Sequence, residues 1–265
     1  MRKNRIVLYL MAFLQGMVFY ASIATLYREE RGLSMLALGG IESASMLLTL
    51  VLELPWGFLA GKLGYKRTLL LVNGVYFLSK VVFWQAHSFA AFLLERLMLS
   101  FVMAGQSGVD NALLYESSRG MDSRKVFGLW NGASTGGVLL ASLGYSLFMG
   151  GNYDLAAFAT VAVYGLAFVA SFFLQEPRQA DLSGQNLLQG MERKGLGRQL
   201  WADLKGQASF LPFLLAGVAL AEANQFGTVF LAQLQYRAAG MASSLMGYAP
   251  MPVSYTHLPA HQTPR

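Results

Sequence analysis

Long apolar blocks, separated by short polar stretches, run through most of the chain. A helix that crosses a bilayer needs about 20 mostly apolar residues, and these blocks reach that length. Since lipid offers the backbone no hydrogen-bond partners, each block is expected to be a helix. A β-barrel would alternate apolar and polar positions over about ten residues, and the blocks show no such alternation. The predicted spans cover residues 6–26, 35–60, 68–86, 88–114, 126–148, 153–174 and 208–233, and Ala238 is the candidate start of an eighth.

The composition agrees with a membrane protein. Hydrophobic residues make up 55% of the 265 positions and charged residues only 13%, whereas soluble domains carry roughly 25% charged residues. So few charges cannot cover a surface that faces water. The sequence has no cysteine, which excludes disulfides and thiolate metal sites, and we expect neither a metal nor a cofactor. The sequence therefore predicts an all-α polytopic membrane protein.

The net charge of +6 is distributed unevenly over the polar stretches. If the N-terminus lies inside and the spans weave, Arg28, Arg31 and Arg237 fall outside. The bases that fall inside are Arg2, Lys3, Arg5, Lys62, Lys66, Arg67, Arg119, Arg124, Lys125, Arg178, Arg193, Lys194, Arg198 and Lys205. This bias predicts a multi-pass protein of the plasma (cell inner) membrane with a cytoplasmic N-terminus. It also argues against nucleic-acid binding, because no basic face rich in aromatic residues accompanies the charge.

The polar stretches divide the chain into four parts. Residues 1–174 form a predicted bundle of six transmembrane helices, and a cleaved signal peptide is the alternative for its first segment. Residues 175–207 form a basic cytoplasmic linker, and residues 208–250 begin a second bundle. Residues 251–265 form a tail without a helical pattern. Six helices, a long linker and further helices indicate a two-half layout with the second half unfinished.

The linker and the tail each carry a more specific expectation. Apolar positions in 196–204 fall on one helical face, which suits a short helix on the inner membrane surface; a plain flexible linker is the alternative. In the tail, Val253–Leu258 resembles the translation of a transposon-end adapter from shotgun sequencing libraries. We therefore expect a truncated reading frame that ends in non-native residues.

A glycine-rich basic stretch, Gly57–Arg67, follows the second predicted span and is expected to form a short cytoplasmic turn. It resembles the loop G-x-L-a-D-r-x-G-r-[KR]-[KR] between helices two and three of the major facilitator superfamily. Gly61 stands where that pattern has an acidic residue, and Lys62 keeps the base that follows. In the family this acid belongs to an ion-pair latch, so the chain lacks that latch residue. The matching positions are Gly57, Leu59, Ala60, Gly64, Lys66 and Arg67.

Other stretches support the same resemblance. Ser107–Ser117 and Glu53–Gly57 are similar to the patterns S-G-x-x-x-A-L-L-Y-[DE]-S and E-x-P-x-G of a poorly characterised bacterial branch of the superfamily. Arg96 matches the intramembrane arginine of helix four, which the family often ties to proton coupling. The resemblance covers roughly residues 1–250. It implies a transporter of twelve helices, of which this chain holds about the first seven.

Several charged residues lie inside the predicted spans, where a charge costs several kcal/mol and faces a partner or water. Helical rise places four in the outer half and two in the inner half, at similar depth. We expect a basic residue of the outer group to pair with an acidic one. The outer group is Glu42, Lys80, Glu95 and Arg96, and the inner pair is Glu53 and Asp110.

The charges suggest different roles. For Arg96 we favour proton coupling over a structural ion pair, with Glu42 as a candidate partner. Glu53 and Asp110 are expected to stabilise a gate rather than contact substrate. For Lys80 we expect a structural ion pair.

Polar and aromatic residues of the spans are candidates for a substrate cavity. The candidates are Gln15, Phe19, Tyr20, Asn131 and Glu222. Packing or lipid contact is the alternative for the aromatic residues, and incomplete packing is the alternative for Glu222. The small-residue spacing of Gly128, Gly132, Gly136 and Gly137 in the fifth span predicts close helix packing.

Two other function classes compete with transport. Gly105–Gly108 matches the G-x-S-G of intramembrane serine proteases, but Ser107 would need a histidine base. His87 lies in an outer loop, and the other two histidines lie in the tail. A membrane receptor or scaffold is the second alternative. The glycine-rich nucleotide-binding loop is absent from the sequence, so ATP-driven pumping has no support.

The sequence thus predicts a secondary active transporter of a small molecule that works by alternating access. The expected partners are the lipid bilayer, the substrate and protons, which would be coupled through Arg96 and a nearby carboxylate. Efflux of small amphiphilic compounds is the first expectation for direction, and uptake is the second. The chain alone is not expected to transport, because half of the cavity wall would be missing.

Overall fold

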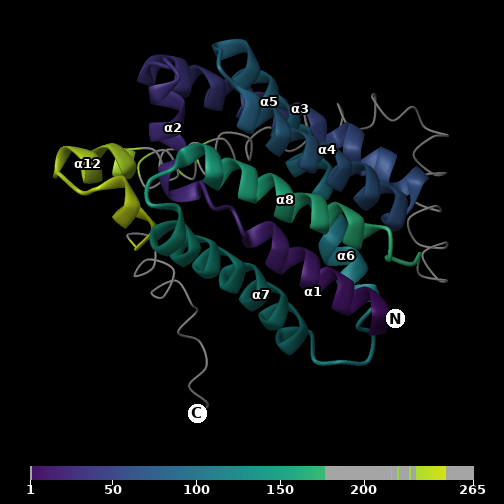
Figure 1. Ribbon diagram of the computed structural model, residues 1–265. Coiled ribbons are helices and arrows are strands. Elements are labelled where there is room, and N and C mark those ends of the chain that lie inside the picture. Colours follow the sequence, from purple (N-terminus) through teal and green to yellow (C-terminus); the bar gives the residue numbers. More distant parts are fainter. Residues whose placement is uncertain (1, 177–215, 217–219, 221–226, 228–230, 249–265) are drawn as a thin grey trace.

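The computed structural model describes residues 2–176, 216, 220, 227 and 231–248 (Figure 1). The interfacial helix expected in the linker, most of the seventh predicted span with Glu222, and the tail lie outside the described residues. The regular secondary structure of the described part is helical. They are α1 (Arg2–Gly16), η1 (Ala21–Ile23), α2 (Ala24–Glu30), α3 (Met35–Leu63), α4 (Tyr65–Gln85), α5 (Phe89–Gln106), α6 (Val109–Glu116), α7 (Ser123–Gly144), η2 (Tyr145–Met149), α8 (Tyr153–Ser171), α12 (Ala232–Ala238) and η4 (Ser243–Tyr248).

Six helical stretches within the described residues are long and apolar enough to cross a membrane, which confirms the expected all-α first bundle. They are Arg2–Glu30, Met35–Glu53, Tyr65–Gln85, Phe89–Glu116, Ser123–Met149 and Tyr153–Ser171. Ala238, the candidate start of an eighth span, instead ends α12. The chain turns at Gly240, whose φ is +80°, and continues into the short 3-10 helix η4.

Two of these spans are interrupted, which the apolar pattern did not predict. The first breaks after α1 ends at Gly16, and the fourth breaks where Ser107 and Gly108 separate α5 from α6. Gly108 has a φ of +79°, a left-handed conformation that glycine adopts at little cost. At the first break, the backbone N–H of Phe19 donates to the Thr160 hydroxyl at 3.1 Å. A side chain thus replaces a lost helical hydrogen bond, as lipid-embedded backbone requires.

The glycine-rich stretch Gly57–Arg67 contains the expected turn between two spans, but most of the stretch is helical. Helix α3 continues to Leu63 and α4 begins at Tyr65, which leaves Gly64 alone to make the turn. Gly64 has a φ of +80°. Only glycine enters that region at little cost, so the residue type permits two long helices to meet at one position.

Helix α1 lies between α7 and α8, and α4 packs against both α8 and α5 (Figure 1). Glycines allow the close approach of α1 and α7. A Cβ on Gly137 would lie 2.1 Å from the backbone oxygen of Phe13, and a Cβ on Gly16 would lie 2.2 Å from that of Ser134. No side chain fits in either place, so both backbones meet directly.

The other glycines of the fifth span do not take part in this contact. A Cβ on Gly128 or Gly132 would meet nothing within 4 Å, and one on Gly136 would only reach the Phe13 ring at 4.0 Å. The packing predicted for this span is therefore correct for Gly137 and wrong for Gly128 and Gly132.

The apolar core of the described residues forms three clusters along the bundle. Phe83 belongs to one, Leu69 to another and Val72 to the third. Leu69 and Phe83 lie fourteen positions apart on α4, roughly 21 Å at the helical rise, and Val72 lies between them. The middle of the bundle therefore contains both an apolar cluster and buried polar side chains such as that of Lys80.

Candidate functional site

A cavity of about 630 Å³ opens in the middle of the bundle. Its walls come from the break after α1 and from α2, α3, α4 and α5, so four spans contribute to it. It is lined by Val18, Tyr20, Ala21, Ala24, Arg28, Glu42, Ser45, Met46, Thr49, Leu50, Glu53, Tyr76, Lys80, Glu95, Arg96, Leu99, Ser100 and Met103.

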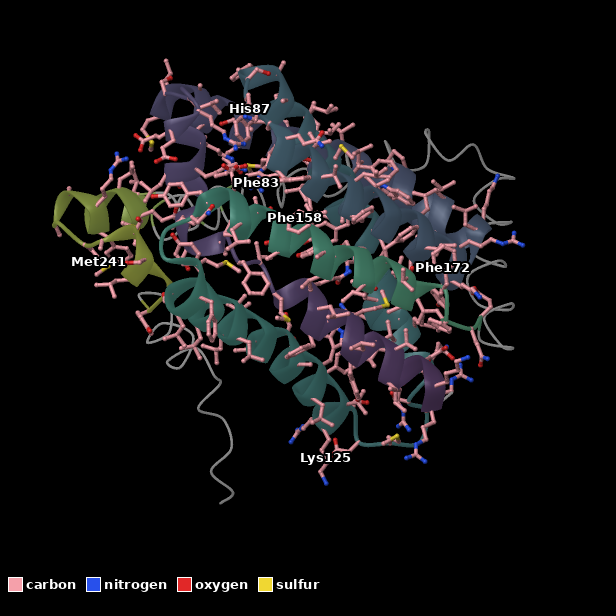
Figure 2. All side chains as sticks on the ribbon, in the orientation of Figure 1. Phe83, His87, Lys125, Phe158, Phe172 and Met241 are labelled. Atoms are coloured by element: carbon pink, nitrogen blue, oxygen red, sulfur yellow. The ribbon has the colours of Figure 1, made fainter. Side chains whose placement is uncertain are left out.

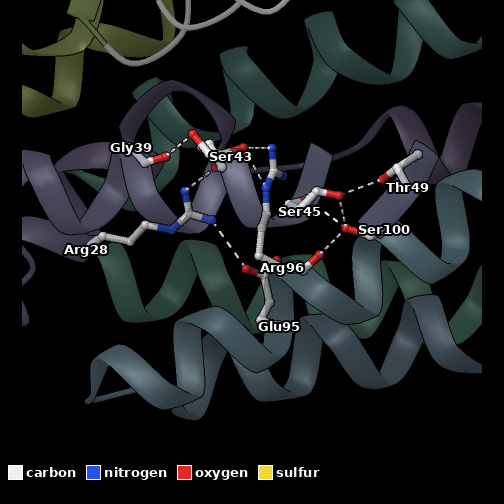
Figure 3. A network of polar contacts seen from close by, with 9 residues as sticks. Arg28, Gly39, Ser43, Ser45, Thr49, Glu95, Arg96 and Ser100 are labelled. Atoms are coloured by element: carbon white, nitrogen blue, oxygen red, sulfur yellow. Dashed lines mark hydrogen bonds and ion pairs between the residues drawn. The ribbon is translucent and has the colours of Figure 1, made fainter. Parts of the chain in front are cut away.

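A network of ion pairs crosses this cavity (Figure 3). Arg28 reaches from α2 to Glu95 on α5, with 3.3 Å between Nη2 and Oε2. The other terminal nitrogen of Arg28 lies 3.7 Å from Glu42 on α3. Arg96 binds the same Glu42 through Nη2 and through Nε at 2.8 Å. Two arginines and two carboxylates from three spans thus form one connected group.

The network is well shielded from solvent. Arg28 is 4% exposed and Glu95 1% exposed. The Nε of Arg28 and one oxygen of each carboxylate, in Glu42 and Glu95, have no hydrogen-bond partner among the described residues. Buried ion pairs are costly to desolvate and very costly to leave half-formed. A network of this kind therefore responds strongly to any change of charge on one member.

Serine hydroxyls hold the helices that carry the network. Ser100 on α5 donates to the backbone oxygen of Ser45 on α3 at 2.8 Å, and the two hydroxyl oxygens lie 2.7 Å apart. Figure 3 shows this contact beside Arg96. The direct α3–α5 contact positions Glu42 opposite the guanidinium of Arg96.

The structure confirms one predicted pair and corrects two assignments. Arg96 and Glu42 pair as expected. Lys80 was expected to join a carboxylate, but within the described part its Nζ contacts the hydroxyl of Tyr20 at 3.1 Å. Arg28, assigned to the outer loops, is instead a buried member of the network. Its position next to Glu29 and Glu30 resembles a helix end in water, and no sequence signal separates it from Arg31.

A second cavity of about 500 Å³ adjoins the first, since Thr49, Glu53, Tyr76 and Met103 line both. A chain of amide side chains borders it. Gln15 donates to Asn73 at 2.5 Å and accepts from Gln106 at 3.3 Å. These hydrogen bonds link α1, α4 and α5 at mid-bundle.

The two inner carboxylates lie beside the second cavity, as their similar depth predicts. Gln106 donates to one oxygen of Asp110 at 2.5 Å, and the other oxygen is buried without a partner among the described residues. Asp110 is 7% exposed, whereas Glu53 is exposed and faces both cavities. The gating role of this pair stays a prediction.

The candidate cavity residues separate into three groups. Tyr20 lines the larger cavity and Gln15 the second. Phe19 instead packs on α7, because a Cβ on Gly144 would lie 3.1 Å from its ring. Asn131 is exposed on α7 and lines neither cavity. Glu222 falls outside the described residues.

The motif stretch contains a contact that sequence reasoning missed. The carboxylate of Glu176, which follows α8, accepts from the backbone N–H groups of Tyr65 at 2.8 Å and Lys66 at 2.7 Å. It thereby binds the positive N-terminus of α4. Gly64 leaves room for it, because a Cβ there would lie 2.9 Å from a carboxylate oxygen. The acid before Pro177 is the sequence signal that could have suggested a helix-end contact.

The other motif residues lie near this contact. Gly57 and Gly61 lie within α3, and Gly61 is exposed beside exposed Lys62. Lys66 is half-buried and Arg67 is exposed at the start of α4. The structure therefore brings the bases of the motif to one end of the bundle.

The geometry gives a protease at Ser107 no support. Ser107 lies at the C-terminal end of α5, and exposed His87 lies just before its N-terminal end, with its ring 2.8 Å from the Gln85 backbone oxygen. The 18 residues of α5 separate them by about 27 Å at the helical rise. The two histidines of the tail lie beyond the described residues.

Comparison with solved structures shows a shared fold. The crystal structure of a mutant of the nucleoside transporter NupG matches with a TM-score of 0.69 and 21% identity, over 95% of this chain and 64% of that one. The structure of NupG itself matches with a TM-score of 0.68 and 22% identity, over 95% and 63%. The chain therefore spans less than two thirds of the length of these structures.

The sequence comparisons give one clear result. A search of curated proteins found no match. A family profile described as Major Facilitator Superfamily matches residues 6–258, nearly the whole chain. This agrees with the six spans and with the resemblance of the motif stretch. The chain belongs to the Major Facilitator Superfamily.

Proposed function

We propose that the protein containing this chain is a secondary transporter in which the Arg28–Glu42–Arg96–Glu95 network couples transport to protons. The observation that supports this most directly is the placement of the network. It lines a cavity inside the membrane-spanning bundle and joins α2, α3 and α5 by ion pairs. Intramembrane charges of this kind mark ion and proton pathways.

A proton on Glu42 would change the network in a defined way. Neutral Glu42 no longer balances Arg96, and Arg28 keeps only Glu95 as its counter-ion. Because unpaired buried charge is costly, the helices that carry these groups then favour an arrangement that gives Arg96 water or another partner. Binding of one proton thus shifts the equilibrium between two packings, which is the requirement for alternating access.

We further propose a cytoplasmic N-terminus in the plasma (cell inner) membrane, on the strength of the inner excess of basic residues. For direction we propose efflux of small amphiphilic compounds, with uptake as the alternative. Apolar Met46, Leu50, Leu99 and Met103 next to the charges support an amphiphilic substrate. A nucleoside belongs in the test panel because the similar structures are named as those of a nucleoside transporter.

The coupling role can be tested with the full-length transporter in proteoliposomes. An imposed pH gradient drives flux through the wild type, and Arg96→Ala is expected to abolish this dependence, because Glu42 loses its main counter-ion. Arg124→Ala, an exposed arginine at the start of α7, is the matched control and keeps wild-type flux. Unchanged pH-driven flux in Arg96→Ala would show that the coupling assignment is wrong.

The same experiment addresses the receptor or scaffold alternative. A receptor binds its ligand without moving it, so no substrate would accumulate under any gradient. Dependence of flux on the sign of the pH gradient separates efflux from uptake. Measurement in both vesicle orientations therefore decides the direction and the class together.

A further inference from the structure

The larger cavity holds more shielded basic than acidic groups. Its lining includes three bases, Arg28, Lys80 and Arg96, and two shielded acids, Glu42 and Glu95. If all are ionised, three positive and two negative charges leave an excess of one positive charge. An uncompensated charge in a bilayer costs several kcal/mol, so this excess calls for an anion.

A third acid of the lining does not cancel the excess. Glu53 is exposed and faces the second cavity as well as the first. It lies eleven positions from Glu42 on α3, roughly 16 Å along the helix axis. At that distance its attraction to the network is much weaker than that of a carboxylate in contact, because the Coulomb energy falls with distance.

Lys80 is the member of this group without a carboxylate. Glu42 is engaged by both arginines, and Glu95 by Arg28. No carboxylate of the described residues lies within 4 Å of the Lys80 ammonium, although the residue is only 4% exposed. The positive excess of the cavity is therefore located at this side chain.

Among the described residues, hydroxyl groups and aromatic faces surround Lys80, and Glu95 acts on it only from beyond 4 Å. Its Nζ lies 4.9 Å from the ring centroids of both Tyr76 and Tyr164, and it donates to Tyr20 at 3.1 Å. Aromatic faces attract a cation without accepting its hydrogen bonds in full. Within the described residues one of the three ammonium donors is used, and the Tyr20 hydroxyl still has its own hydrogen to donate. Several donors thus converge where the described part of the chain offers no further acceptor.

We propose that Lys80 and Tyr20 bind the anionic group of a small amphiphilic organic anion, such as an aromatic carboxylate. The apolar body of the ligand lies along Met46, Leu99 and Met103, which line the same cavity. A volume of about 630 Å³ falls in the usual range for small-molecule sites. This inference rests on the proposed transport function and names its substrate class, and Lys80 becomes a binding residue instead of a structural ion pair.

The test is a binding measurement that needs no transport. The full-length transporter is reconstituted in lipid nanodiscs, and its affinity for benzoate and benzamide is measured by calorimetry and thermal shift. The two probes share a ring and nearly the same shape but differ in charge. Benzoate is expected to bind about tenfold or more tightly than benzamide, since a hydrogen bond to a charged group contributes more than a neutral one.

Variants locate the ligand. Lys80→Met keeps the length and apolar stem of the side chain and is expected to remove the preference for benzoate. Lys125→Met is the matched control, because Lys125 is exposed at the start of α7 (Figure 2), and it keeps the preference. Leu99→Trp fills the cavity without changing its charge and is expected to weaken binding of both probes. Leu99→Trp also tests the site if Lys80→Met does not fold.

Three results would overturn the proposal. They are equal affinity for both probes in the wild type, no binding of either probe, and a preference for benzoate that survives Lys80→Met. Either of the first two results is also expected if another carboxylate of the protein already neutralises Lys80. None of them affects the coupling test with Arg96→Ala, so failure of this site and failure of proton coupling are distinguishable.

Discussion

At the scale of single residues, Arg28 holds the polar centre of the bundle together. Its two terminal nitrogens bind carboxylates on different spans, Glu42 on α3 and Glu95 on α5, and its guanidinium lies 5.4 Å from the ring centroid of Phe83. A planar guanidinium has the several donors that such bridging needs. Lysine could not replace it, because a single ammonium presents no such fork.

Removal of Arg28 should destabilise the protein through the carboxylates that it leaves behind. Arg28→Met is expected to lower the free energy of unfolding by about 3–5 kcal/mol, because buried Glu95 loses its counter-ion. Adding Glu95→Gln should restore part of this loss, since the amide is neutral. Chemical unfolding in lipid micelles measures both. Equal losses in the single and double variants would show that Glu95 does not depend on Arg28.

The participation of Arg28 illustrates what the sequence could not reveal. Arg96 and Glu42 were predictable, because both lie deep in apolar blocks where a charge needs a partner. Arg28 lies near the end of its block, among other charges, and an arginine there is compatible both with exposure to water and with a buried ion pair. The break after Gly16 turns α2 toward the cavity, and this bend places Arg28 in the network.

At the scale of elements, glycines decide which helices can touch. Gly16 and Gly137 bring α1 and α7 into backbone contact, whereas Gly132 on the same helix has open space around it. The small-residue spacing predicted that α7 packs closely, but spacing alone does not show which face meets α1. That choice depends on the bend of the first span, where the chain leaves the helical path at Gly16.

Two glycine substitutions on α7 should have opposite effects. Gly137→Ala is expected to destabilise the protein by about 1–3 kcal/mol, because the new methyl group pushes α1 away. Gly132→Ala, five positions earlier, should stabilise it by about 0.5–1 kcal/mol, because alanine is the better helix former. Thermal unfolding of the two variants in one detergent gives the comparison. Similar shifts for both would show that α1 and α7 are not in backbone contact.

The apolar blocks predicted the six spans because length and hydropathy are properties of whole segments. They did not predict the break at Ser107 and Gly108, since glycine is also frequent inside unbroken transmembrane helices. The sequence pattern likewise did not show that the turn is confined to Gly64. The glycines and lysines of residues 61–66 suggest exposure, but exposure is compatible with a helix end.

At the scale of the whole molecule, the first and last spans of the bundle are joined directly. The side chain of Asn4 on α1 donates to the Gln175 backbone oxygen at 2.7 Å and accepts from the Gln175 N–H at 2.9 Å. The adjacent Glu176 binds the start of α4 at Tyr65. Three distant parts of the sequence therefore meet at the end of the bundle that carries the motif bases.

Loss of the Glu176 carboxylate should loosen this end. Glu176→Ala is expected to cost about 1 kcal/mol, as for other helix caps, and to speed amide hydrogen exchange at Tyr65 and Lys66. Glu30→Ala, an exposed acid at the end of α2, is the control and should leave both amides protected as in the wild type. Unchanged exchange in Glu176→Ala would show that the carboxylate does not cap α4.

These contacts also set an order of assembly during synthesis. Asn4, Tyr65 and Lys66 are synthesised early. Their hydrogen-bond partners, Gln175 and Glu176, are synthesised only after the sixth span. Since chains fold from the N-terminus as they emerge, the first five spans wait in the membrane with these groups unpaired. The bundle closes only when residue 176 has left the ribosome, so a nascent chain stopped before Gln175 would stay open at that end.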